Sequence, residues 1–168
     1  MGQPTDEVDR IVSAWERERP DLPTVALSVF SRITRLARYL DRARRAAFAQ
    51  HGLEVWEFDV LTALRRAGSP YELTPGTLMT ETMVSSGTMT NRIDRLVAHG
   101  LVRRAADSRD RRVVRVRLTE EGLRTVDAAM TDLLRVEAEV LQTLPHGEQE
   151  HLAGLLRHLL VQFEVPGP

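Results

Sequence analysis

The sequence predicts a mainly α-helical fold with one small β-hairpin, an α+β arrangement. Two observations indicate it: apolar residues recur every three or four positions through most of the 168 residues, whereas residues 101–118 alternate between apolar and charged side chains. A hydrophobic content of 42% is enough for a packed core. No run of about 18 apolar residues occurs and the chain starts with an acidic segment, so we expect a soluble, cytoplasmic protein with no membrane partner.

The first 52 residues are expected to form two helices. Residues 7–20 have helical character and stop at Pro20, which lacks a backbone donor and disfavours helix in the residue before it. From about Thr24 to Gln50, apolar residues separated by arginines repeat at intervals of three and four. Gly52 ends this longer helix.

A third helix is expected over Val55–Arg66. It places Phe58, Leu61 and Leu64 on one face, and that pattern is typical of a helix packed against a core. Residues 68–73 begin with a glycine in the position of a helix stop, and we expect them to form a loop.

Two short helices joined by a tight turn should follow. Thr74 caps the first, which extends to about Glu81, because threonine accepts from free amides and Pro75 loses no hydrogen bond in a first turn. Ser85 or Ser86 offers a cap for the second. Its apolar stripe consists of Met89, Ile93, Leu96 and Val97. Such a pair of helices is a helix-turn-helix.

The alternating segment predicts a β-hairpin directly after these helices. Its strands are residues 101–105 and 113–118, joined by a polar, charged loop. A hairpin in this place is a wing, and the predicted fold is therefore a winged helix-turn-helix.

Two further helices are expected after the hairpin. Thr119 caps the first, which should run to about Leu144, and Pro145 then breaks the chain. The last helix carries an apolar face made of Leu152, Leu155, Leu156, Leu159 and Phe163.

Basic charge is concentrated around the predicted hairpin although the net charge of the chain is −1. Nine arginines lie between Arg92 and Arg117, against three aspartates in the same segment. A partner responds to the local field more than to the net charge. This distribution favours double-stranded DNA as the partner and places the protein at the nucleoid.

The second short helix should present a polar face opposite its apolar stripe. At about 100° per residue, Thr88, Asn91 and Arg95 point away from the core. Arginine favours guanine and asparagine favours adenine in the major groove. The candidate DNA-contacting residues of this helix are Ser86, Thr88, Thr90, Asn91 and Arg95. The alternative is a polar face in contact with solvent alone.

The tip of the predicted hairpin is a second candidate DNA contact. Arg109, Arg111 and Arg112 lie there, and guanidinium groups enter minor grooves or contact phosphates. Asp110 is expected to orient a neighbouring arginine. The alternative is a solvated turn whose aspartates pair with the arginines.

Several function classes are excluded by composition. The chain has no cysteine, which rules out disulfides, thiolate zinc sites, cysteine nucleophiles and thiol redox sensing. Its five histidines do not form a metal-ligand cluster, and no serine has a base partner at a recognisable spacing. We therefore expect no metal, no cofactor and no enzymatic activity.

The segment LTPGTLMTETMVSSGTMTNRIDRLVAHGLVRRAADSRDRRVVRVRLTEEG resembles the MarR family, most specifically in DSRDRR followed by RLTEEG. The flanking helices also fit, so the resemblance covers nearly the whole chain. It implies a homodimer built from the N- and C-terminal helices, with a small-molecule pocket between the dimer helices and each winged lobe. We expect three regions: 1–52 for dimerisation and the pocket wall, 53–118 for DNA binding, and 119–168 for dimerisation.

A narrower resemblance, in SAWERERP, LEVWEFDVLTALRRAG and SGTMTNRIDRL, is to the urate-responsive, PecS-like branch of that family. It implies a ligand site formed by Trp15, Asp59, Arg92 and Arg104. Guanidinium groups and an indole suit a planar anionic purine. The alternatives are that Trp15 is dimer core, that Asp59 and Arg92 are a structural ion pair, and that Arg104 contacts a phosphate.

Together these observations predict a repressor that binds a pseudo-palindromic operator as a dimer and is released by a urate-like ligand. A phenolic acid is an alternative effector. An architectural winged-helix DNA binder without an effector is the alternative function.

Overall fold

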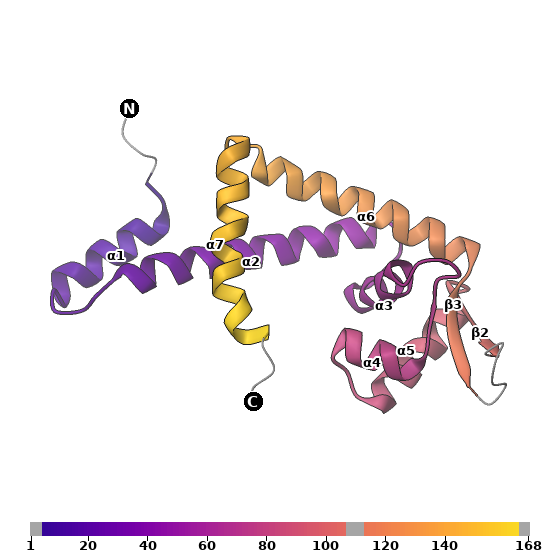
Figure 1. The fold of residues 1–168 in the computed structure, drawn as a ribbon. Coiled ribbons are helices and arrows are strands. Elements are labelled where there is room, and N and C mark those ends of the chain that lie inside the picture. Colours follow the sequence, from indigo (N-terminus) through magenta and orange to yellow (C-terminus); the bar gives the residue numbers. More distant parts are fainter. Residues whose placement is uncertain (1–4, 107–112, 165–168) are drawn as a thin grey trace. The chain divides into compact units, whose positions relative to one another are not determined.

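The computed structural model describes residues 5–106 and 113–164, and Figure 1 shows its elements in chain order. The chain divides into two compact units, Met1–Ala46 and Ala47–Pro168, each of which is described by itself. The expected functional division at residues 52 and 118 stays a prediction.

Two helices make up the described part of the first unit. These are α1 (Glu7–Glu18) and all but the last turn of α2 (Val25–Ala49), which confirms both predicted helices. Asp6 caps α1 by accepting from the backbone N–H of Asp9 at 3.0 Å. Arg32 on α2 donates to Asp6 at 2.9 Å and to Asp9 at 2.6 Å, so the cap of α1 is also tied to α2.

The second unit contains the predicted winged helix-turn-helix and the C-terminal helices. Its elements are α3 (Val55–Arg66), β1 (Glu72–Leu73), α4 (Pro75–Thr82), α5 (Ser86–Ala98), β2 (Val102–Ala106), β3 (Val114–Leu118), α6 (Glu120–Leu141) and α7 (His146–Glu164). The bounds of α3 agree with the prediction, and α4 and α5 are the expected pair of short helices.

The core of this unit forms around α3. Phe58 is buried and stacks on Phe48, with ring centroids 3.9 Å apart. Leu61 and Leu64 are fully buried on the same helix, which confirms the predicted apolar face. The other elements contribute Leu78, Met89, Ile93, Leu96, Val102, Val116, Val126 and Ala129. Helices α4, α5 and α6 are therefore all held to α3 by one continuous hydrophobic cluster.

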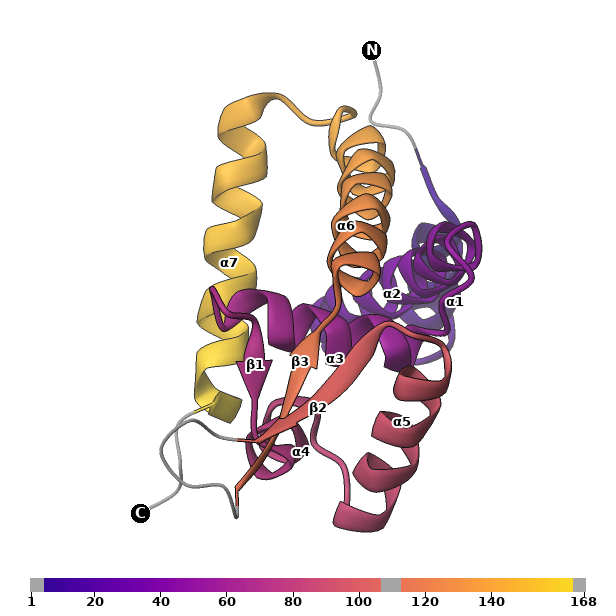
Figure 2. The same cartoon turned by 90° about the vertical axis from the view of Figure 1, so that its right-hand side faces the viewer.

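The three strands form an antiparallel sheet in the order β1-β3-β2 (Figure 2). Residue Val102 pairs with Leu118 and Ala106 with Val114, which confirms the predicted hairpin. The expectation of a loop throughout residues 68–73 was wrong, because Glu72–Leu73 pairs with β3. A strand of two residues is too short to show an alternating pattern, and its existence depends on the partner strand.

Two other expectations need correction. Val97 is 37% exposed, whereas the other three residues of the predicted stripe are buried. It lies about 70° from the centre of those three around the helix, at the edge of the contact with the core. Helix α6 ends at Leu141, before the expected Leu144. The side-chain amide of Gln149 donates to the carbonyls of Leu141 and Leu144 at 3.1 and 3.0 Å, so it supplies hydrogen bonds to carbonyls in the turn between α6 and α7.

The start of α6 approaches the backbone directly before β2 very closely. Thr119 accepts from the N–H of Gly122 at 2.9 Å, as its predicted cap role requires, and its own N–H donates to the carbonyl of Leu101 at 3.1 Å. A Cβ placed on Gly122 would lie 1.9 Å from that carbonyl oxygen. Only glycine therefore allows this approach.

We expect Gly122→Ala to lower the free energy of unfolding by about 1–3 kcal/mol, because α6 must move away from Leu101 and disturb the core around it. Urea denaturation followed by circular dichroism measures the change. Gly147→Ala is the control, since a Cβ there meets nothing within 4 Å. Equal stability of Gly122→Ala and the wild type would contradict the role given to this close approach.

Helix α7 has no buried residue in the single chain. The exposed fractions of Leu155, Leu160 and Phe163 are 51%, 55% and 81%. None of the helices in the described part of the chain is both long and apolar enough to span a bilayer.

Candidate functional site

The helix-turn-helix is shaped by local capping interactions. Thr74 accepts from the N–H of Thr77 at 3.1 Å and Pro75 is the first residue of α4, as predicted. Met83 ends α4 with a left-handed backbone (φ 52°) and turns the chain toward α5. Of the two predicted caps of α5, Ser85 occupies the cap position, and Ser86 is the first helical residue.

The predicted DNA-contacting residues on α5 all lie on its exposed face. The side that packs into the core consists of Met89, Ile93 and Leu96, each no more than 2% exposed. The exposed side carries Ser86, Thr88, Thr90, Asn91 and Arg95. The hydroxyl of Thr90 donates to the carbonyl of Ser86 at 3.0 Å, and that of Thr88 lies 3.0 Å from the Ser85 hydroxyl. The helix therefore has a buried apolar side and a separate polar side that is open to a partner.

Arg95 is held by two residues at the start of α3. Its Nη2 donates to Glu54 Oε1 at 2.6 Å, and its Cζ lies 4.7 Å from the centre of the Trp56 ring. Trp56 Nε1 donates to the other oxygen of Glu54 at 2.7 Å. These hydrogen bonds, first from Trp56 and then from Arg95, lower the pKa of Glu54 below its usual value. Glu54 is therefore ionised at neutral pH.

Arg92 lies on the flank of α5, half-buried, as predicted from its angle to the apolar stripe. Its Cζ is 5.4 Å from the centre of the Trp56 ring. A pocket of about 510 Å³ forms beside it, lined by Glu54, Trp56, Gly87, Thr88, Asn91, Arg92 and Arg95. One pocket therefore collects residues from the exposed face of α5 and from the start of α3.

The remaining candidate ligand residues lie elsewhere. Arg104 on β2 donates to Asp94 of α5 at 2.5 Å. Asp59 on α3 lines a smaller pocket of about 250 Å³, together with the ion-paired Arg66 and Glu81. Trp15 belongs to α1 of the first unit and is 47% exposed. Within the second unit, Asp59 and Arg92 thus line different pockets.

The β-hairpin carries its arginines on both faces. Arg117 lies on the central strand β3. Its partner on β2 is Arg103, and its partner on β1 is Glu72. Like charges facing each other across strands destabilise a sheet, and an anionic partner would remove that cost. The predicted tip residues Arg109, Asp110, Arg111 and Arg112 lie outside the described residues.

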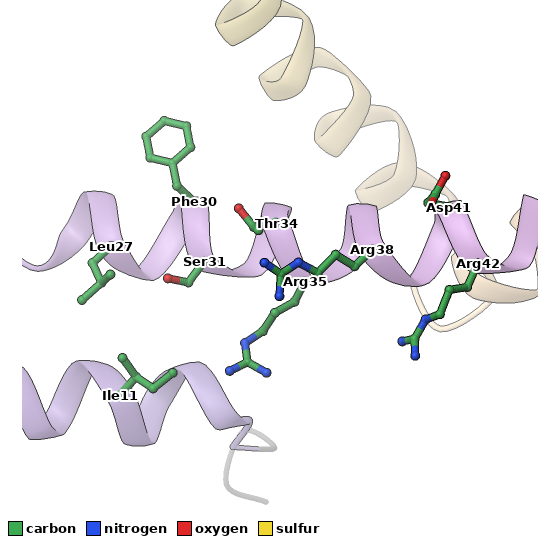
Figure 3. A pocket seen from close by; sticks show the side chains of 9 residues that line it. All are labelled: Ile11, Leu27, Phe30, Ser31, Thr34, Arg35, Arg38, Asp41 and Arg42. Carbon is green, nitrogen blue, oxygen red and sulfur yellow. The ribbon is translucent and has the colours of Figure 1, made fainter.

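A second large pocket lies in the first unit, between α1 and α2 (Figure 3). It measures about 880 Å³ and combines apolar with basic side chains. Leu27 and Arg35 project from α2 toward α1, from which Ile11 points back. Arg38 and Arg42 continue its basic part along α2. The sequence predicted that residues 1–52 take part in dimerisation and form a pocket wall, but it did not single out this group of residues.

Glu54 and Trp56 are the site residues that sequence reasoning missed. Glu54 caps α3 and Trp56 lies in its first turn. The sequence predicted this helix from its apolar face, and nothing in the spacing of these two residues links them to α5. The nearest signal is the pair of an acidic and an aromatic residue at a helix start, which is too common to indicate a site. In the part of the chain that the structure covers, no three histidine, aspartate or glutamate residues come together as a metal site would require.

Comparison with known sequences gives a consistent result. Residues 51–113 match the MarR family. The chain is 35% identical over 150 residues to the HTH-type transcriptional regulator PecS of Dickeya dadantii (strain 3937), and the alignment covers 89% of this chain and 90% of that protein. An uncharacterised HTH-type regulator of Bacillus subtilis, YwaE, is 32% identical over 74 residues, or 44% of this chain and 43% of its own.

Solved structures show the same fold. A MarR family protein from Bacillus stearothermophilus superposes with a TM-score of 0.73 at 26% identity, over 85% of this chain and 99% of that one. A mutant MarR from E. coli complexed with operator DNA superposes with a TM-score of 0.65 at 24% identity, over 87% and 97% of the two chains.

Proposed function

Because this chain belongs to the MarR family of transcriptional regulators, we propose that it is a sequence-specific, homodimeric repressor that leaves its operator when a urate-like ligand binds. DNA binding is supported by the two sides of α5: one side is buried in the core, and the other exposes Asn91 and Arg95. In a dimer, two such helices enter successive major grooves about 34 Å apart. Enzymatic inactivity and a place at the nucleoid stay predictions.

A homodimer is proposed because the terminal helices leave large apolar side chains exposed in the single chain, and contiguous exposed apolar surface is typical of protein interfaces. In the first unit, Val25 is 76% and Phe30 is 55% exposed, and Phe163 on α7 is 81% exposed. A second copy of the chain offers the same helices and so a self-complementary partner. Dimerisation brings two α5 helices to one operator.

The proposed effector is a small anionic aromatic molecule, most specifically urate or a related purine. Trp15, Asp59, Arg92 and Arg104 stay its predicted contacts, although Asp59 and Arg92 line different pockets in the single chain. Support comes from the 35% identity to PecS and from the half-buried place of Arg92 on the flank of α5. Arg92 and Arg95 both belong to α5. An anion held by Arg92 would therefore also act on the orientation of Arg95, and we propose that it favours orientations of α5 that fit the major groove of DNA poorly. Ligand and DNA then oppose each other, and the coupling is reciprocal.

We expect urate to lower the operator affinity of the wild type by about 5–150-fold, the range of typical allosteric couplings. Arg92→Ala and Trp15→Phe should keep most of the operator affinity and lose this release. Asp59→Asn should change the response to urate more than the affinity without it. Mobility-shift titrations with urate, xanthine and salicylate measure these effects, with Arg124→Ala as a control for loss of an arginine outside the proposed site.

The three ligands also separate the alternatives. Release by salicylate but not by the purines would make the protein a phenolic-acid sensor. Operator binding that none of them changes would contradict the effector proposal and favour a winged-helix DNA binder without an effector. Thermal shift in the absence of DNA gives an independent measure, because a true effector stabilises the folded protein.

A further inference from the structure

Arg95 is supported on two sides by residues of its own chain. One nitrogen of its guanidinium donates to Glu54 Oε1 at 2.6 Å, and the group lies over the Trp56 ring at 4.7 Å. Trp56 itself donates to Glu54 Oε2 at 2.7 Å, so the carboxylate and the ring hold each other as well as the arginine. An exposed arginine normally samples many rotamers, and these contacts restrict it to few.

The position of this support relative to α5 is determined by a buried contact. Glu57 is 1% exposed, and one of its carboxylate oxygens accepts from the backbone N–H of Glu54 at 2.9 Å. The other oxygen lies 2.9 Å from Nδ1 of His99, the residue that caps the C-terminus of α5. The start of α3 and the end of α5 are thereby joined, and Glu54 stays within reach of Arg95.

The support leaves Arg95 able to read a base. A guanidinium has five N–H donors, and the bond to Glu54 Oε1 uses one nitrogen of the fork. Bidentate recognition of guanine needs two donors, and holding the fork in place beforehand reduces the entropy lost on binding.

We propose that Glu54 and Trp56 are positioning residues that give Arg95 its sequence selectivity. Trp56 supports the face of the guanidinium, and Glu54 sets its rotation. The inference rests on the proposed reading of bases by Arg95. It makes the start of α3 part of the specificity of the site although neither residue belongs to the helix-turn-helix.

The test compares two DNA duplexes. One is the sequence that the full-length wild type enriches most from a random library, and the other is a scrambled duplex of the same length and base composition. The ratio of the two affinities is the readout. We expect this ratio to fall about tenfold in Glu54→Gln and in Trp56→Leu, because the contact between Arg95 and its base becomes weaker. Trp56→Phe keeps a ring face and loses the Nε1–H, so its ratio should lie between those of the wild type and Trp56→Leu.

A double-mutant cycle separates positioning from a general structural role. If Glu54 acts through Arg95, Glu54→Gln has no effect on the ratio in an Arg95→Ala background. Glu121→Gln is the matched control, because it makes the same change at an exposed glutamate paired with Arg124 on α6. Its ratio should equal that of the wild type.

The outcomes distinguish a positioning role of Glu54 and Trp56 from base reading by Arg95. If Arg95→Ala lowers the ratio and neither Glu54→Gln nor Trp56→Leu does, the positioning role is wrong and base reading by Arg95 stands. An equal effect of Glu54→Gln with and without Arg95 would also overturn positioning. A ratio that Arg95→Ala leaves unchanged would remove Arg95 from base reading, and the proposed DNA-reading face would fail with it.

Discussion

Leu155→Glu combined with Leu159→Glu should make the protein monomeric and lower its operator affinity by about 10²–10⁴-fold. The two residues are one helical turn apart on the predicted apolar face of α7, and they are 51% and 36% exposed in the single chain. Two carboxylates there cannot be buried against a second copy without a large desolvation cost. A monomer then binds one half-site and loses the gain from linking two recognition helices. Light scattering measures the mass, and a mobility shift measures the affinity.

Arg157→Glu is the matched control for this pair. It changes the net charge by the same two units, and at about 100° per residue it lies on the other side of α7. We expect it to remain dimeric and to keep most of the operator affinity. Dimeric Leu155→Glu/Leu159→Glu protein would show that α7 does not form the interface. A truncation ending at Pro145, which should be monomeric or insoluble, examines the same assignment in a second way.

Arg95→Ala should weaken operator binding by about 1–3 kcal/mol for each recognition helix and relax the preference for one base in each half-site. The loss has two parts, because the substitution removes both the base contact and a guanidinium that Glu54 and Trp56 already hold in place. Binding to a scrambled duplex should change less. Affinity measurements on operator variants with one base pair changed identify the position that Arg95 reads.

Arg112→Ala provides the contrast, since it was predicted to contact DNA from the hairpin tip. We expect it to weaken binding to all duplexes similarly and to reduce the slope of log affinity against log salt by about one. Operator affinity unchanged in both variants would contradict docking through the winged helix-turn-helix.

The sequence by itself determined the elements whose causes lie within a few residues. Thr74 and Thr119 cap helices by accepting from an N–H three residues on, so the cap and its partner can be read together from one short segment. The buried stripe of α5 follows from the helical period in the same way. The exposed face that carries Asn91 and Arg95 was therefore predictable as the opposite side of that stripe.

Only the tertiary structure decided which distant residues meet. Glu54 and Arg95 are 41 residues apart, and their contact depends on how α3 packs against α5. The strand β1 exists because Glu72–Leu73 finds β3, more than 40 residues later. The packing of β2 against α5 brings Arg104 to Asp94. The packing of the helices also places Asp59 and Arg92 in different pockets. Capping and periodicity act over one or two helical turns, whereas these contacts depend on the packing of whole elements.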